Sequence, residues 1–195
     1  MCSHLLMKPS SRRLKFALVL HVVGRSTHTT VLPEPTYTGP ENVVYFRTVT
    51  GLDEELERDK RVTWLVTFYT VWNPSCTNFA PVFAKLSAEY ALDNYKFGKI
   101  DVGRYPDAAR KYQINDSSLS RQLPTLIQFK QGKEVERRPT VDHNGKLVKF
   151  FFSEDNIKAA FDMNNIYTEC KANPLKKKKA VSDVNGVENT HIKSE

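Results

Sequence analysis

Hydrophobic positions change their period near residue 72. Residues 62–69 form an apolar run rich in β-branched and aromatic side chains, which is typical of a buried strand. Beyond residue 75 the apolar positions recur at helical spacing, at Cys76, Phe79, Ala80, Phe83, Leu86 and Tyr90. The pattern therefore predicts a strand followed by a helix, with Cys76 in or near the first helical turn.

The same two periods predict alternating strands and helices along the rest of the chain. Further strands are expected at residues 43–47, 96–101, 124–129, 135–141 and 147–152. Helices are expected at residues 52–60, at residues 106–112 and after Ser153. Because helices separate the central strands, this order predicts an α/β fold with a mixed sheet.

Local signals add detail at the ends of these elements. Acidic residues open the expected 52–60 helix, and Ser153 is placed to cap the last helix, with acids in its first turn. Turns are expected at Gln131-Gly132 and at Asn144-Gly145, and the second carries the signature of a type I′ hairpin. Residues 115–121 are expected to form a loop, in which Asn115 begins a glycosylation sequon.

Charge divides the chain into three parts. The net charge is +7 in 195 residues, but residues 37–170 hold equal numbers of acidic and basic side chains. The excess lies in residues 1–36 and residues 171–195. We therefore expect a leader, one folded domain over residues 37–170, and a basic polar tail. A neutral domain argues against nucleic acid as a partner, since binding needs a basic face on the fold.

The two ends leave alternatives open. The apolar run at residues 16–23 is shorter than the roughly 20 residues that span a bilayer, so the leader is either disordered or a weak signal peptide. Four lysines at residues 176–179 form either a solvated tail or a contact with an anionic membrane surface.

Three cysteines are present, at positions 2, 76 and 170. Their spacing predicts no disulfide framework, no zinc site and no cofactor. A helix N-terminus favours the thiolate of Cys76, whereas burial would oppose it. The sequence therefore leaves two roles open for Cys76: inert packing in the core or monothiol chemistry. Cys2 and Cys170 lie near the ends, and we expect them to cross-link more readily.

Several stretches resemble thioredoxins. Trp72-Asn73-Pro74-Ser75-Cys76 stands where thioredoxins have their W-C-x-x-C motif, and Leu123-Pro124 resembles their cis-proline segment. Pro81 and Lys99 match further positions of the family. The chain is thus identified as a thioredoxin-like α/β protein, with a central mixed sheet flanked by helices and a cis Pro124. Longer strings within residues 36–170 resemble a narrower family, that of thioredoxin-related transmembrane protein 2.

The resemblance implies a site. Cys76 is the candidate catalytic residue, and the expected substrate-binding residues are Trp72, Asn73, Pro74, Ser75, Leu123 and Pro124. No metal is implied. Asn73 replaces the attacking cysteine, Thr67 replaces the buried carboxylate that moves protons, and Lys99 is thereby left without that carboxylate. We therefore expect no efficient disulfide oxidoreductase, and whether the chain is an enzyme stays open. The bulky segment 137–139 is expected to reshape the substrate groove.

The narrower family also implies a cellular role. Its members regulate redox state and protein folding at the endoplasmic reticulum membrane and its mitochondrial contacts. In these members, membrane-spanning segments precede the thioredoxin-like domain. We do not find such segments in this sequence, so the chain alone could be soluble. The expected mechanism is monothiol exchange or a disulfide-linked homodimer. The alternative is a non-catalytic thioredoxin-fold binding or scaffold module. Expected partners are proteins, including folding or membrane proteins of that compartment.

Overall fold

The computed structural model describes residue 37 and residues 39–175. All of these belong to the unit formed by residues 33–195. The expected leader, Cys2 and most of the expected basic tail lie outside the described residues, so these predictions stay predictions.

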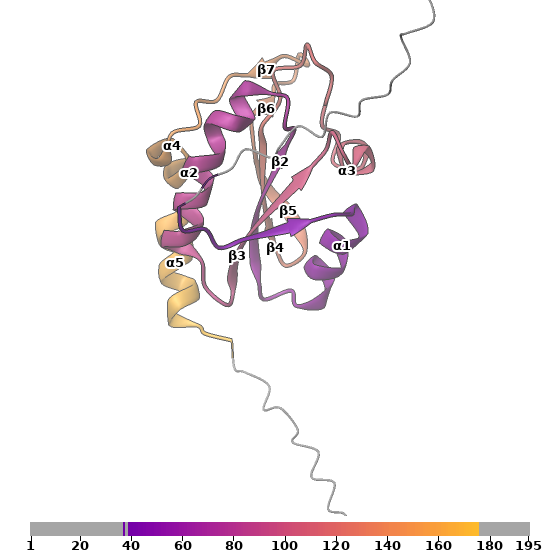
Figure 1. Cartoon of the computed structure of the whole chain (residues 1–195). Helices are drawn as coiled ribbons and strands as arrows, with labels where there is room; N and C mark the ends of the chain where they lie inside the picture. Colours follow the sequence, from indigo (N-terminus) through magenta and orange to yellow (C-terminus); the bar gives the residue numbers. More distant parts are fainter. Residues whose placement is uncertain (1–36, 38, 176–195) are drawn as a thin grey trace, which may run out of the picture. The chain divides into compact units, whose positions relative to one another are not determined.

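A five-stranded sheet is the centre of the domain (Figure 1). Its strands lie in the order β1 (Val43–Phe46), β3 (Tyr95–Asp101), β2 (Thr63–Tyr69), β4 (Thr125–Lys130) and β5 (Lys133–Arg138). The first three run parallel, and β4 and β5 are antiparallel to their neighbours. The predicted α/β fold with a mixed sheet is therefore confirmed.

Helices cover both faces of this sheet (Figure 1). Helices α2 (Pro74–Tyr90), α4 (Glu154–Ala160) and α5 (Met163–Ala172) lie on one face, and α1 (Val49–Arg58) and α3 (Pro106–Lys111) lie on the other. Every residue of β2 is buried, which explains why its sequence is a continuous apolar run rather than an alternating one. On β2, Leu65 packs into the core beneath α2, whereas Trp64 and Val66 pack into the core beneath α1.

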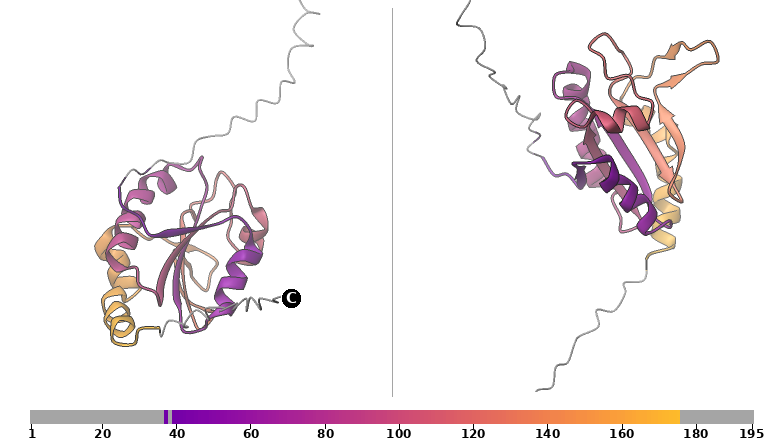
Figure 2. Two further views of the ribbon diagram at one scale, coloured as in Figure 1. Left: turned by 60° about the horizontal axis from the view of Figure 1, so that its bottom comes forward. Right: turned by 90° about the vertical axis from the view of Figure 1, so that its right-hand side faces the viewer.

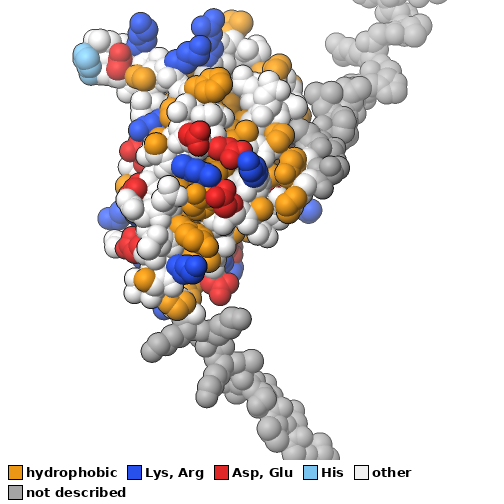
Figure 3. Space-filling model, turned by 90° about the vertical axis from the view of Figure 1, so that its left-hand side faces the viewer, with side chains coloured by type: hydrophobic (Ala, Val, Ile, Leu, Met, Phe, Trp, Pro, Cys, Tyr) orange, Lys and Arg blue, Asp and Glu red, His pale blue; other side chains and the backbone are white. Residues whose placement is uncertain are grey.

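Ion pairs link the helices on the α2 face. Lys85 of α2 contacts Glu154 of α4 at 2.8 Å, and Lys158 of α4 contacts Glu89 of α2 at 3.2 Å. Figure 3 views this face and shows acidic and basic side chains side by side at its middle. Because these pairs are partly exposed, each contributes about 0–1 kcal/mol at most.

A small hairpin follows the sheet. Strands β6 (Thr140–Val141) and β7 (Leu147–Val148) pair with each other and stand out from the main sheet (Figure 2). The peptide bond before Pro139 is cis, and this proline separates β6 from β5. The predicted strand at residues 135–141 is thus interrupted, since proline has no N–H to donate to the ladder. The predicted strand at residues 147–152 is paired over its first two residues.

One edge of the sheet is strand β5, whose residues are mostly charged. Arg137 pairs with Glu134, and Arg138 pairs with Glu136, so the charges of this strand are largely matched within it. A two-residue turn joins β4 to β5, with positive φ at both Gln131 (55°) and Gly132 (76°). The turn predicted there is confirmed, and its dihedrals are of the type I′ class.

Two of these sequence predictions were wrong in detail, and one helix was not predicted. Helix α1 begins at Val49 with Thr48 as its cap, so its acidic residues lie beyond the first turn. At the tip of the small hairpin Gly145 has a positive φ of 73° and Asn144 does not, which excludes a type I′ turn. The helix predicted after Ser153 is α4, with Ser153 as its cap. Asp162, in a left-handed conformation (φ 49°), separates it from α5, a helix that was not predicted.

Candidate functional site

The start of helix α2 is organised by Asn73. Its side-chain oxygen accepts a hydrogen bond of 2.8 Å from the backbone N–H of Ser75, and its carbonyl accepts one of 3.0 Å from that of Cys76. Pro74 occupies the first helical position, where the missing N–H costs nothing. Asn73 is therefore the N-cap of the helix, in the position that thioredoxins give to a cysteine.

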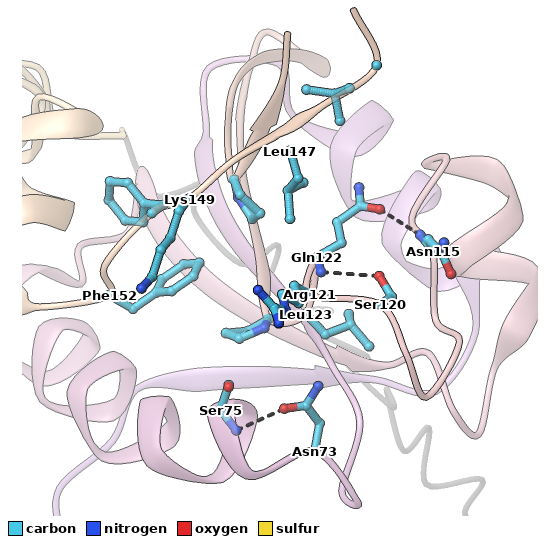
Figure 4. A pocket seen from close by; sticks show the side chains of 15 residues that line it. Asn73, Ser75, Asn115, Ser120, Arg121, Gln122, Leu123, Leu147, Lys149 and Phe152 are labelled. Carbon is cyan, nitrogen blue, oxygen red and sulfur yellow. Dashed lines mark hydrogen bonds between the residues drawn. The ribbon is translucent and has the colours of Figure 1, made fainter.

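A pocket of about 750 Å³ opens beside this helix start (Figure 4). Asn73 and Ser75 border it from α2. The loop before β4 and the segments around the small hairpin supply the rest of its wall: Asn115, Ser120, Arg121, Gln122, Leu123, Pro124, Pro139, Val141, Gly145, Leu147, Lys149, Phe150 and Phe152. Segments more than 70 residues apart in the sequence thus meet at one concavity.

Of the six predicted substrate-binding residues, the structure brings four together. Asn73, Ser75, Leu123 and Pro124 border the pocket, and the peptide bond before Pro124 is cis, as predicted. The other two, Trp72 and Pro74, are not among the described residues that border the pocket. The Trp72 side chain is 41 % exposed. A substrate role for all six residues stays a prediction.

Cys76 lies beneath the surface. It is 3 % exposed and packs in the core cluster that also contains Val102 and Leu123. Burial raises the pKa of its thiol to about 11, and hydrogen bonding to Thr70 only partly opposes this. The helix terminus was expected to favour the thiolate, but removal from water outweighs it. At neutral pH the thiol is protonated, which makes it a poor nucleophile.

A buried carboxylate does lie near this thiol, and the sequence did not single it out. Asp101 ends strand β3, is 2 % exposed, and accepts hydrogen bonds from the backbone N–H groups of Gly103 (2.9 Å) and Arg104 (3.2 Å). Its negative charge adds to the raised pKa of Cys76. The signal that could have found it is its place at the end of a parallel strand, where β3 and β2 deliver side chains to the same edge.

The neighbouring family positions are rearranged. Thr67 stands on β2 opposite Lys99, and its hydroxyl is buried with no hydrogen-bond partner among the described residues. The ammonium of Lys99 lies 3.5 Å from Glu41 instead. Lys99 therefore has a carboxylate partner, though on the surface and not under the helix start.

The segment 137–139 reaches the pocket through one residue, and that its bulk reshapes the groove stays a prediction. Pro139 lines the pocket directly. Arg138 lies over the ring of Phe150 at 5.9 Å, which is a cation–π distance, and Phe150 also lines the pocket. The guanidinium of Arg137 donates a hydrogen bond of 3.1 Å to the carbonyl of Tyr112, and Arg137 is not among the residues that border the pocket.

Cys170 does not lie at a mobile end. It is in helix α5, is 8 % exposed, and its sulfur lies 3.8 Å from the carbonyl oxygen of Asn94. Burial raises the pKa of this thiol as well. The expectation that Cys170 cross-links readily was wrong, because a helix packed on the sheet covers it. Within the described ranges, no three His, Cys, Asp or Glu side chains gather closely enough to hold a metal ion.

Eleven of the fifteen lining residues were not among the predicted substrate-binding residues. The basic and aromatic ones are Arg121, Lys149, Phe150 and Phe152. They are distant from the Cys76 turn in the sequence and no motif marks them. Only the folded positions of the loop before β4 and of the segment after β7 bring them to the pocket (Figure 4).

In the part of the chain that the structure describes, no helix combines the length and the apolar character needed to cross a membrane.

Comparison with known proteins agrees with this geometry. A profile of the Thioredoxin family matches residues 43–152. The thioredoxin-related transmembrane protein 2 homolog of Drosophila melanogaster is 62% identical over 156 residues, covering 80% of this chain and 56% of that protein. Thioredoxin-related transmembrane protein 2-A of Danio rerio is 50% identical over 137 residues, covering 70% of this chain and 45% of that protein.

Comparison of the fold with solved structures also finds a thioredoxin. The crystal structure of thioredoxin NaTrxh from Nicotiana alata superposes with a TM-score of 0.50 at 24% identity, covering 66% of this chain and 97% of that one. This chain spans about half the length of the curated relatives described above. Because the profile match covers more than half of the sequence, the chain belongs to the thioredoxin family, and it is similar to thioredoxin-related transmembrane protein 2.

Proposed function

We propose that this domain binds extended polypeptide segments in the pocket between the start of α2 and Pro124, without dithiol exchange. One observation supports this above the others. The pocket is open beside Asn73 and Pro124, while the motif's remaining thiol, on Cys76, is buried and protonated. An open pocket beside the motif, together with a buried thiol, supports binding of a partner without thiol chemistry.

The pocket has the composition that a peptide site needs. Leu123, Pro124, Phe150 and Phe152 supply apolar contact area at one side. Asn115, Ser120 and Gln122 supply polar groups at the other, and they are held in place by one another: Gln122 accepts from the N–H of Asn115 (2.9 Å) and its N–H donates to Ser120 (3.2 Å). Apolar walls with a few fixed polar groups are typical of binding sites.

The names of the relatives support a wider setting for this role. We propose a thioredoxin-like, redox-related function in protein folding, at the endoplasmic reticulum membrane and its contacts with mitochondria. The curated relatives are named as transmembrane proteins, which supports membrane association. Partners would be folding or membrane proteins of that compartment, bound as segments that are not yet folded.

A second candidate is monothiol exchange at Cys76, which one observation favours. Cys76 lies in the first turn of α2, directly after Ser75, which borders the pocket. If this turn opened, its thiolate would attack a partner's disulfide and release the partner's other sulfur as a thiolate. The mixed disulfide would then persist, since Asn73 has no sulfur to resolve it. A second copy's Cys76 thiolate that attacked this mixed disulfide at the Cys76 sulfur would release the partner's thiolate and leave a Cys76–Cys76 homodimer.

Binding of a cysteine-free peptide by the full chain tests the first candidate. Overlapping peptides on an array identify a binder, whose affinity is then measured by fluorescence anisotropy. Ser75→Phe places a ring in the pocket and should weaken binding about tenfold or more. Asn78→Phe, on an exposed position of the same helix, is the matched control and should bind like the wild type. Equal loss in both variants, or binding that requires Cys76, would refute the binding role.

A further inference from the structure

The pocket has charge of one sign. Among the described residues that border it, two carry charge, Arg121 and Lys149, and none is an aspartate or glutamate. They come from separate segments, the loop before β4 and the stretch after β7, as Figure 4 shows. A concave surface with cations from two sides concentrates positive potential.

These two cations differ from most others in the domain. Neither Arg121 nor Lys149 has an ion-pair partner among the described residues. Ten other basic side chains do: Arg58, Lys60, Arg61, Lys85, Lys99, Arg110, Lys111, Arg137, Arg138 and Lys158. Many cations of the domain are thus paired with nearby carboxylates, and the two that border the pocket are not.

We infer that the pocket selects an acidic polypeptide segment of a partner protein, with Arg121 and Lys149 as the residues that determine this specificity. The inference rests on the binding role proposed above and deepens it. A carboxylate side chain of the bound segment would supply the partner that both cations lack. Neighbouring apolar side chains of the segment would contact Leu123 and Phe152.

Charge also argues against this chain's own ends as the occupant. Residues 1–36 hold five Lys or Arg and one acidic residue, and residues 171–195 hold six and three. Both ends are net basic and would be repelled by the pocket. The occupant that the charges favour is therefore a segment of another protein.

Three peptides that differ at one position test the inference, with glutamate, glutamine or lysine there in an otherwise identical binder. The full chain should bind the glutamate form about five- to tenfold tighter than the glutamine form, and the lysine form more weakly still. The difference should shrink in 1 M salt, where screening acts over about 3 Å.

Charge-neutral variants locate the effect. Arg121→Gln with Lys149→Gln should remove the preference, so that the glutamate and glutamine peptides bind this variant with equal affinity. Lys130→Gln with Lys133→Gln removes the same charge from the far end of β4 and β5, and should keep the preference. If the pocket variant keeps the preference, or if all three peptides bind equally, the inference is wrong while the binding role stands. If no peptide binds at all, both are wrong.

Discussion

The side chain of Asn73 accepts a hydrogen bond of 2.8 Å from the backbone N–H of Ser75. The position that holds an attacking cysteine in thioredoxins therefore holds the N-cap of α2 here. Asparagine is among the preferred capping residues, because its oxygen satisfies an N–H that has no partner within the helix. Loss of the first thiol is thus coupled to a gain in local stability.

Replacing this cap should destabilise the protein. We expect Asn73→Ala to lower the free energy of unfolding by about 0.5–2 kcal/mol, and Asn73→Asp to lower it much less. Urea unfolding followed by circular dichroism measures both. Asn78→Ala, at an exposed position further along α2, is the control. A cap role would be excluded if Asn73→Ala were as stable as that control.

Insulin reduction tests the absence of dithiol chemistry. We expect little or no turnover from the full chain, because Asn73 has no thiol and the thiol of Cys76 is buried. Asn73→Cys should recover only part of the activity of an ordinary thioredoxin. It restores a sulfur, but it removes the cap, and Thr67 still provides no carboxylate. Wild-type turnover close to that of thioredoxin would contradict this expectation.

The reactivity of Cys76 should depend on pH in a defined way. With a pKa of about 11, roughly one thiol in 10⁴ is ionised at pH 7, so alkylation should be slow and should rise up to about pH 11. Asp101→Asn removes a negative charge and should lower the pKa, so the rate at a given pH rises. Mass spectrometry of the Cys76 peptide measures the rate, and Cys76→Ser controls for labelling elsewhere. Fast alkylation at pH 7 would show that the site opens.

The same thiol should make stability fall at alkaline pH. Its folded pKa of about 11 lies above the ordinary value of 9.0, so its contribution is complete below pH 9 and is lost as the pH rises through 11. The loss should reach up to about 2–3 kcal/mol. The difference in unfolding free energy between wild type and Cys76→Ala should decrease by that amount as the pH rises across this range. Parallel curves for the two proteins would rule this out.

Non-reducing gels after mild oxidation separate the two proposed functions. Because Cys76 and Cys170 are both buried, we expect Cys76→Ser to leave any dimer band unchanged, and Cys170→Ser likewise. Cys2→Ser is the third variant of the set. If the band disappears only in Cys76→Ser, the thiol is accessible in solution and monothiol exchange becomes the better account.

The order of strands and helices followed from hydrophobic periodicity, because burial in a layered fold imposes that period on the sequence. The fully buried β2 and the long helix α2 were the clearest cases. Helix boundaries were less accurate where two signals competed. In α1 the acidic residues suggested a start at 52, but the hydroxyl of Thr48 accepts from the N–H of Gly51 and starts the helix earlier.

Turn conformations depended on side-chain contacts that composition does not reveal. Asn144-Gly145 has the residues of a type I′ turn, yet the carboxylate of Asp142 accepts from the N–H groups of Asn144 and Lys146 and imposes another geometry. Helix α5 was not predicted, because the apolar positions assigned to the last helix ended at Phe161; the buried positions of α5, at Met163, Ile166 and Cys170, follow in a different helical register.

Only part of the candidate site could be predicted from the sequence. Residues close to Cys76 and Pro124 came from the resemblance, whereas Arg121, Lys149 and Phe152 depend on loops that only the fold brings together. Whether Cys76 reacts could not be predicted either. A helix terminus and burial shift its pKa in opposite directions, and the extent of burial is a property of the packed core.

Strand β5 also limits how this protein meets copies of itself. An unpaired strand edge is a template onto which another chain can add its own strand, and proteins commonly block such edges with charge and proline. Here the edge is dense in Lys, Glu and Arg and stops at Pro139. Edge-to-edge pairing of copies of this protein through β5 is thus disfavoured.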